Sequence, residues 1–126
     1  MVRMVTAAAL AVLIAGVGSA AASPESNGFL TKAAAAEQRG DIPAAVQLLQ
    51  SAIIYAPADT LPYDQLAGLY ARTGRPNLAR KYYDLALQID PQDVAARQGV
   101  TQLDQASEDK NRTSAEGAQD AAAPKL

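Results

Sequence analysis

The chain has 126 residues, enough for one small domain, and 49% of them are apolar while only 5% are aromatic. Its formal net charge of −2 is too small to steer a charged partner, and its 11 Lys and Arg residues are scattered rather than gathered into the basic surface that nucleic-acid binding needs. The chain has no Cys and no His, which excludes disulfides, thiolate metal sites and Ser–His or Cys–His catalysis.

The first 22 residues have the layout of an export signal. Arg3 precedes an apolar run over residues 4–17, and small residues follow the run. Ala20 and Ala22 fit an Ala-x-Ala cleavage pattern, so we expect a cleaved signal peptide and a periplasmic or secreted mature protein. In the alternative, residues 4–22 are not cleaved and anchor the protein in the inner membrane.

A repeat of 34 residues organises the middle of the chain. Gly40 begins Gly-Asp-Ile-Pro-Ala-Ala, and Gly74 begins the related sequence Gly-Arg-Pro-Asn-Leu-Ala. Prolines, alanines and large side chains stay in step on both sides of these glycines. The matching pairs are Phe29 and Tyr63, Ala33 and Ala67, Leu49 and Tyr83, Ala52 and Ala86, Pro57 and Pro91, and Asp59 and Asp93.

The length and content of this repeat resemble the tetratricopeptide repeat family. The second copy, residues 60–93, fits the family pattern closely, whereas in the first copy, residues 26–59, Lys32 and Ala36 replace a leucine and an aromatic residue. The resemblance implies an all-α fold, a right-handed solenoid of two helical hairpins. It assigns these residues to the repeat core and turns: Phe29, Gly40, Ala45, Leu49, Ala52, Pro57, Tyr63, Leu66, Ala67, Tyr70, Gly74, Ala79, Tyr83, Ala86 and Pro91.

Local physical chemistry also predicts a helix–turn–helix in each copy. In the second copy, Tyr63, Leu66 and Tyr70 share one helical stripe. Gly74 can adopt a positive φ and end that helix, and Pro76 suits the first turn of the next one. The same reasoning along the chain predicts helices over residues 26–38, 42–56, 60–72, 76–89 and 93–106.

The fifth of these helices is expected to cover the apolar face of the last repeat through Val94, Arg97, Val100, Thr101 and Leu103. Beyond it, residues 107–125 contain no large apolar side chain, so we expect a disordered tail. The predicted organisation is a signal peptide at 1–22, a repeat domain at 23–106 whose capping helix covers 94–106, and a tail at 107–126.

The sequence favours binding over catalysis. Its carboxylates sit mostly at helix caps or on polar helix faces, and it has no phosphate-binding loop, so we expect no enzyme activity, no metal and no cofactor. The family resemblance implies a groove for a partner peptide or helix. It places these residues in that groove: Leu30, Ala34, Glu37, Leu61, Asp64, Gly68, Ala71, Arg72, Gln98, Gln102 and Gln105.

Two functions therefore compete. The leading hypothesis is an adaptor of the bacterial cell envelope that binds a protein partner. A carboxylate clamp of the kind some family members use is not expected, because Leu30, Ala34, Asp64 and Gly68 occupy its positions. The alternative is a structural subunit of an envelope complex, either self-associating as a homodimer or tethered to the membrane by an uncleaved N-terminal segment.

Overall fold

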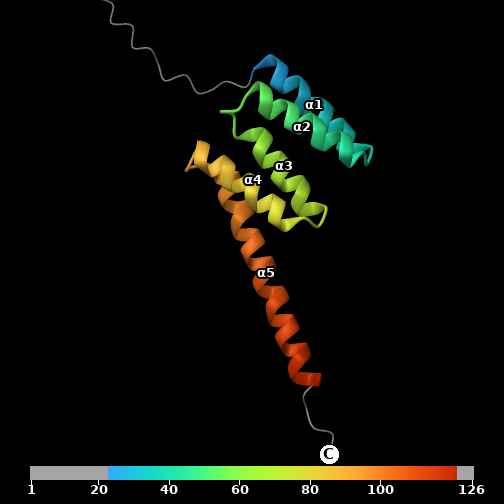
Figure 1. Cartoon of the computed structure of the whole chain (residues 1–126), viewed down its shortest axis with the longest axis vertical. Coiled ribbons are helices and arrows are strands. Elements are labelled where there is room, and N and C mark those ends of the chain that lie inside the picture. Colours follow the sequence, from blue (N-terminus) through green and yellow to red (C-terminus); the bar gives the residue numbers. More distant parts are fainter. Residues whose placement is uncertain (1–22, 122–126) are drawn as a thin grey trace, which may run out of the picture.

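A computed structural model describes residues 23–121, and these residues form five α-helices (Figure 1). The all-α architecture of helical hairpins confirms the predicted fold class. The expected signal peptide at residues 1–22 lies outside the described residues. The helices are α1 (Pro24–Gln38), α2 (Ile42–Tyr55), α3 (Leu61–Arg72), α4 (Pro76–Ile89) and α5 (Val94–Ala121).

The turn within each hairpin is built in the same way. Gly40 and Gly74 have φ angles of 75° and 76°, a conformation that favours glycine. The N–H of the next residue then closes each helix end by donating to a carbonyl five residues back, from Asp41 to Ala36 at 2.9 Å and from Arg75 to Tyr70 at 2.8 Å. The 34-residue period is therefore present in the backbone hydrogen bonds as well as in the sequence.

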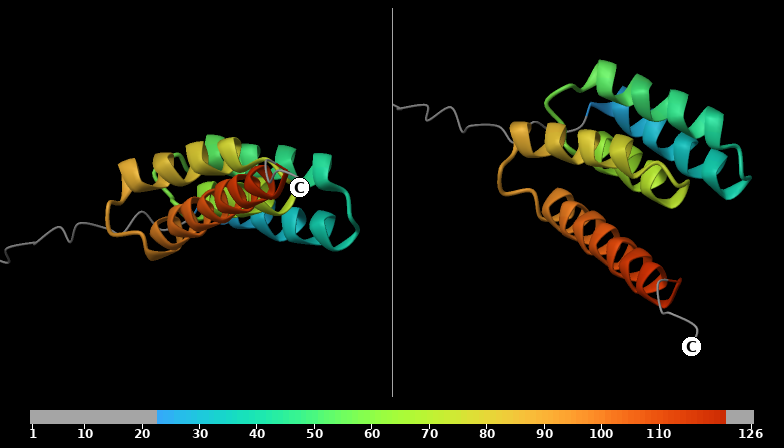
Figure 2. Two further views of the ribbon diagram at one scale, coloured as in Figure 1. Left: turned by 90° about the horizontal axis from the view of Figure 1, so that it is seen from below. Right: turned by 60° about the horizontal axis from the view of Figure 1, so that its bottom comes forward.

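The turns between hairpins repeat too. The Asp59 N–H donates to Ala56 O, and the Asp93 N–H donates to Asp90 O, both at 3.1 Å. The Tyr63 hydroxyl donates to the carbonyl of Pro57 at 3.0 Å, which fixes the first of these turns to α3. Because the chain reverses at every turn, consecutive helices run antiparallel and stack into one curved array, which we call the ladder (Figures 1 and 2).

Small side chains dominate the core. Eight of its fifteen buried apolar residues are alanines, so the helices can approach closely, and the tyrosines fill the remaining space. Phe29 is only partly buried, and the predicted repeat prolines Pro57 and Pro91 are exposed in their turns. The buried set is Leu30, Ala33, Ala36, Ala45, Leu49, Ala52, Tyr63, Leu66, Ala67, Leu69, Tyr70, Ala79, Tyr83, Ala86 and Ala96.

The fifth helix differs from the prediction in length. It continues to Ala121, so the expected disorder of the tail is not found for residues 107–121, and Figure 1 shows this part projecting past the other four helices. All side chains described between residues 104 and 118 are exposed. Burial therefore does not hold this half in place; Ala, Glu, Gln, Lys and Arg, which favour helix intrinsically, make up much of it.

The face that α5 presents to the repeats also differs from the expected one. Ala96 and Gly99 are buried, and Val100 and Leu103 are partly buried. Val94, by contrast, is 65% exposed. Arg97 and Thr101, the other two residues expected on the covering face, are exposed as well. The packed stripe therefore starts at Ala96 rather than Val94.

Candidate interaction groove

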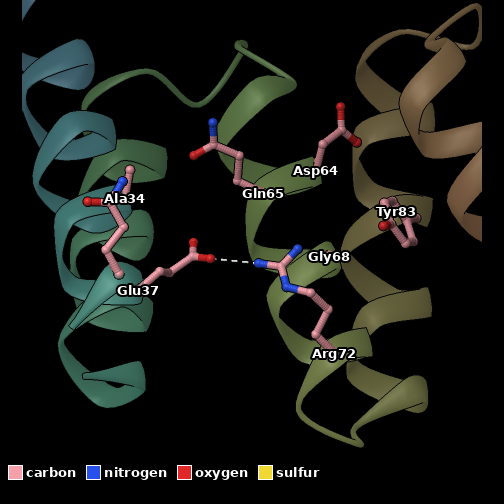
Figure 3. A pocket seen from close by; sticks show the side chains of 8 residues that line it. Ala34, Glu37, Asp64, Gln65, Gly68, Arg72 and Tyr83 are labelled. Atoms are coloured by element: carbon pink, nitrogen blue, oxygen red, sulfur yellow. Dashed lines mark hydrogen bonds and ion pairs between the residues drawn. The ribbon is translucent and has the colours of Figure 1, made fainter. Parts of the chain in front are cut away.

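A groove between α1 and α3 lies at several of the predicted binding positions. Its volume is about 520 Å³, and small residues on both helices, Ala34 and Gly68, keep it open. Polar side chains surround these small residues (Figure 3). The lining residues are Ala34, Glu37, Gln38, Asp64, Gln65, Gly68, Arg72 and Tyr83.

An ion pair bridges the two helices across this groove. The Arg72 Nη2 donates to Glu37 Oε2 at 2.6 Å, as Figure 3 shows. The Arg72 side chain is 63% exposed and the Glu37 side chain 26%, so the pair contributes at most about 1 kcal/mol to stability. The two charges neutralise each other locally and leave the nitrogens and oxygens of both side chains available for further hydrogen bonds.

Tyr83 joins the groove to the core. Its ring packs against Gly99 of α5, where a Cβ atom would overlap the ring atoms. Its hydroxyl lies beside Gly68 of α3, 3.7 Å from where a Cβ would stand. Two glycines thus make room for one tyrosine between three helices. Burial raises the pKa of Tyr83, and the negative charge of Asp64 adds to the rise while Arg72 opposes it.

Asp64 is an unusual carboxyl at the end of the groove next to α5. Burial, together with the neighbouring carboxylates of Asp93 and Asp59, raises its pKa to about 7. Its Oδ1 atom is buried without a hydrogen-bond partner. Below about pH 7 the pair of Asp64 and Asp93 therefore holds a proton, because two adjacent, partly buried carboxylates repel each other when both are ionised.

Asp93 is the member of this pair that stays ionised. Burial alone would raise its pKa, but hydrogen bonds from Thr60, Ala96 and Asp64 lower the pKa below its ordinary value. The N–H of Ala96 donates to Asp93 Oδ1 at 3.1 Å, so Asp93 also caps the start of α5. The charge on Asp93 therefore has a structural use at this helix end.

Not all residues assigned to the groove by sequence lie in it. The structure brings together Ala34, Glu37, Asp64, Gly68 and Arg72. Leu30 does not belong to the groove, because its side chain is 8% exposed and is part of the core. Leu30 and Asp64 are equivalent positions one repeat apart, and in both copies this position points partly inward.

The remaining expected groove residues lie elsewhere. Leu61 is 46% exposed at the first turn of α3, and Ala71 packs against the core. The three glutamines of α5 are exposed and line no cavity described for residues 23–121; they are Gln98, Gln102 and Gln105. A shift of the packed stripe on α5 turns these glutamines away from the repeats.

Sequence reasoning missed three lining residues. Gln38 and Gln65 add amide groups to the wall, and Tyr83 adds a hydroxyl although its ring was assigned to the core. Gly68 is the sequence feature that could have predicted the position of Tyr83, because a glycine on α3 leaves room for the tyrosine side chain to extend from α4 into the groove.

The groove offers both hydrogen-bond donors and hydrogen-bond acceptors. Amides, a guanidinium, a hydroxyl and carboxyl oxygens surround an open floor, a set suited to the alternating N–H and C=O groups of a peptide. Among residues 23–121 no group of three or more carboxylates could hold a metal ion. Within the same described range, none of the helices has the length and apolar character needed to cross a membrane.

The comparisons with known proteins agree with this geometry. Residues 60–103, which hold α3, α4 and the start of α5, match the family model described as tetratricopeptide repeat. No curated protein matches the chain. Repeats of this family generally mediate protein–protein interactions and generally act as non-catalytic scaffolds. The matched segment is a tetratricopeptide repeat, and the 34-residue period of the backbone extends the same hairpin geometry to the first copy.

Proposed function

We propose that this protein is a non-catalytic adaptor of the bacterial cell envelope, and that it binds an extended peptide or a helix of a protein partner in the groove between α1 and α3. The observation that carries the proposal is the construction of the groove. Ala34 and Gly68 leave its floor open, and hydrogen-bonding side chains surround it over about 520 Å³. A shallow polar groove of this kind suits a peptide backbone better than a small apolar ligand.

The envelope location rests on the sequence of the first 22 residues. A weak positive charge, an apolar run and an Ala-x-Ala site support export and cleavage before Ser23. N-terminal sequencing of the protein from the periplasmic fraction tests this part. A mature chain that begins at Ser23 is expected, and a chain that keeps Met1 and sediments with membranes would contradict cleavage and favour a tethered subunit.

The groove is tested by filling it. Gly68→Leu places a branched side chain on the floor, where the nearest atoms are the flexible end of Arg72 at 3.4 Å and the Tyr83 hydroxyl at 3.7 Å. Gly28→Leu is the matched control, because Gly28 is on α1 but does not line the groove, and a Cβ there meets nothing within 4 Å. Both variants should keep the helical circular dichroism of the parent chain.

The binding assay is a pull-down from envelope extract with each chain. The parent and Gly28→Leu are expected to recover the same protein, and Gly68→Leu and the charge reversal Arg72→Glu are expected to lose it. Recovery of that protein in equal yield by Gly68→Leu would show that the partner binds elsewhere.

A further inference from the structure

Exposed apolar side chains gather on one edge of the ladder. This edge, which we call the acidic edge, holds the start of α1 and the two turns between hairpins at residues 56–60 and 90–93; Figure 1 shows all three on the same side. Five of the six large exposed apolar residues of the described chain lie at helix ends on this edge, and Ile54 at 77% exposed and Val94 at 65% are the most open. The five are Ile54, Tyr55, Leu61, Ile89 and Val94.

Carboxylates outnumber cations on this edge. Glu25, Asp59, Asp90 and Asp93 lie at the same helix ends and turns, and the cations near them are Lys32, beside Glu25 and Tyr55, and Arg97 in the first turn of α5. An anionic lipid surface would repel such an edge. Its complement is a surface that offers apolar hollows next to cations.

The opposite edge of the same molecule has that composition. This edge, which we call the hollow edge, contains the turns at residues 39–41 and 73–75. A hollow of about 350 Å³ opens there between α2 and α3, lined by Ile42, Pro43, Val46, Tyr70, Thr73 and Arg75. A second hollow of about 310 Å³ opens between α4 and α5, lined by Pro76, Leu103, Ala106, Ser107 and Lys110.

Each hollow has a cation at its rim. Arg75 stands at the first and Lys110 at the second. Arg39 adds a further positive charge to this edge, Asp41 carries the opposing one, and the ion pair of Glu37 with Arg72 adds no net charge. The hollow edge is therefore positive overall, while the acidic edge is negative.

The two edges also share one spacing. The two turns of the acidic edge are one repeat apart, because each connects one hairpin or helix to the next. The two hollows are also one repeat apart, because each lies in the crevice beside one hairpin. We propose that copies of this chain associate edge to edge, with the two turns of the acidic edge of one copy seated in the two hollows of the next.

In this arrangement the exposed carboxylate of Asp90 of one copy faces Lys110 of its neighbour. Apolar side chains of the acidic edge, such as Ile54 and Val94, enter the hollows. The surfaces that meet are different, so every copy keeps one free edge of each kind and the association is open-ended rather than closed at a dimer. This inference does not depend on the α1–α3 groove, which lies on another face of the ladder.

The experiment is sedimentation velocity of the mature chain, residues 23–126, from about 10 µM to about 1 mM, the range in which a small interface associates. The average mass is expected to rise steadily with concentration and to fall back in about 1 M NaCl, where charges are screened beyond a few Å. A mass equal to one chain at every concentration would overturn the proposal and assign the acidic edge to a different protein.

A charge exchange shows whether the two edges face each other. Asp90→Lys and Lys110→Glu are each expected to raise the concentration needed for association at least about tenfold, while an equimolar mixture of the two restores it. Asp84→Lys on α4 and Arg112→Glu on the opposite face of α5 are the controls, since neither residue lies on an edge contact. Association that resists both variants, or a mixture that stays dissociated, would overturn the proposal.

Discussion

The contact between Gly99 and Tyr83 gives the sharpest test of how α5 joins the repeats. A methyl group at position 99 would overlap three atoms of the tyrosine ring. The ring cannot turn aside, because Tyr83 is only 9% exposed and its hydroxyl already lies beside Gly68 of α3. Gly99→Ala must therefore push α5 away from α4 and open the contacts of Ala96.

Two effects set the magnitude. Overpacking of a rigid site costs about 1–3 kcal/mol, and the overlap with a held ring places this site near the upper end. Replacing glycine by alanine within a helix recovers about 1 kcal/mol from propensity. The expected net loss is about 2 kcal/mol, which lowers the melting temperature of a domain of this size by about 10 °C.

Thermal unfolding followed by circular dichroism measures this loss. Gly28→Ala is the matched control, since a Cβ there meets nothing within 4 Å and the same propensity gain should raise the melting temperature by a few degrees. If Gly99→Ala melts at or above the temperature of the parent chain, α5 does not pack on Tyr83 and the capping role of this helix is wrong.

Three further predictions concern the core, a turn and the buried carboxyl. Leu49→Ala removes a fully buried side chain of α2 and should lower the free energy of unfolding by about 3 kcal/mol in urea titrations. Tyr63→Phe loses the bond to Pro57 O and should lower it by about 1 kcal/mol, a change that is absent if the turn is held by packing alone. The folded-state pKa of Asp64 is raised from 3.8 to about 7, so its contribution to stability is complete below pH 4 and is lost as the pH rises toward 7. Asp64→Asn should remove this decline and, after screening of a half-exposed site is allowed for, stabilise the protein by about 1 kcal/mol at pH 8. The lowered pKa of Asp93 affects stability only in more acidic solution. A parent chain that is equally stable at pH 5 and pH 8 would contradict the account.

Most of the fold could be predicted from residues whose roles are local. Gly40 and Gly74 sit at positive φ in the two hairpin turns, as expected for glycine at a helix end. Asp41 caps α2 by accepting a bond from the Ala44 N–H at 3.2 Å, a role typical of Asp directly before a helix. These features depend on a few neighbouring residues and so are visible in a single sequence.

The features that sequence reasoning missed depend on contacts between helices. The family resemblance places Leu30 in the groove, because a resemblance gives the helix position of a residue but not how far neighbouring side chains cover it. The packed face of α5 differs from the predicted one for a similar reason, because the Tyr83 ring lies against Gly99, where a larger side chain would overlap it. Tyr82, which is not among the predicted core residues, stacks on Tyr70 with ring centroids 5.6 Å apart.

The helical tail shows a different limit. Residues 107–121 lack the apolar side chains that would fix them to the domain, and this absence favoured disorder. The structure follows helix propensity and continuity with the packed half of α5 instead. Nucleation, the unfavourable step of helix formation, is already complete at Val94, so each further residue is added at little cost.

Site-specific photo-crosslinking in the source cell tests the central claim most directly. A photoreactive residue replaces Gln65 on the wall of the groove or, in a parallel sample, Gln50 on the exposed outer side of α2. The account predicts that position 65 forms a crosslink to a defined partner protein and that position 50 does not. A partner that crosslinks from position 50 and not from position 65 would contradict binding in the groove.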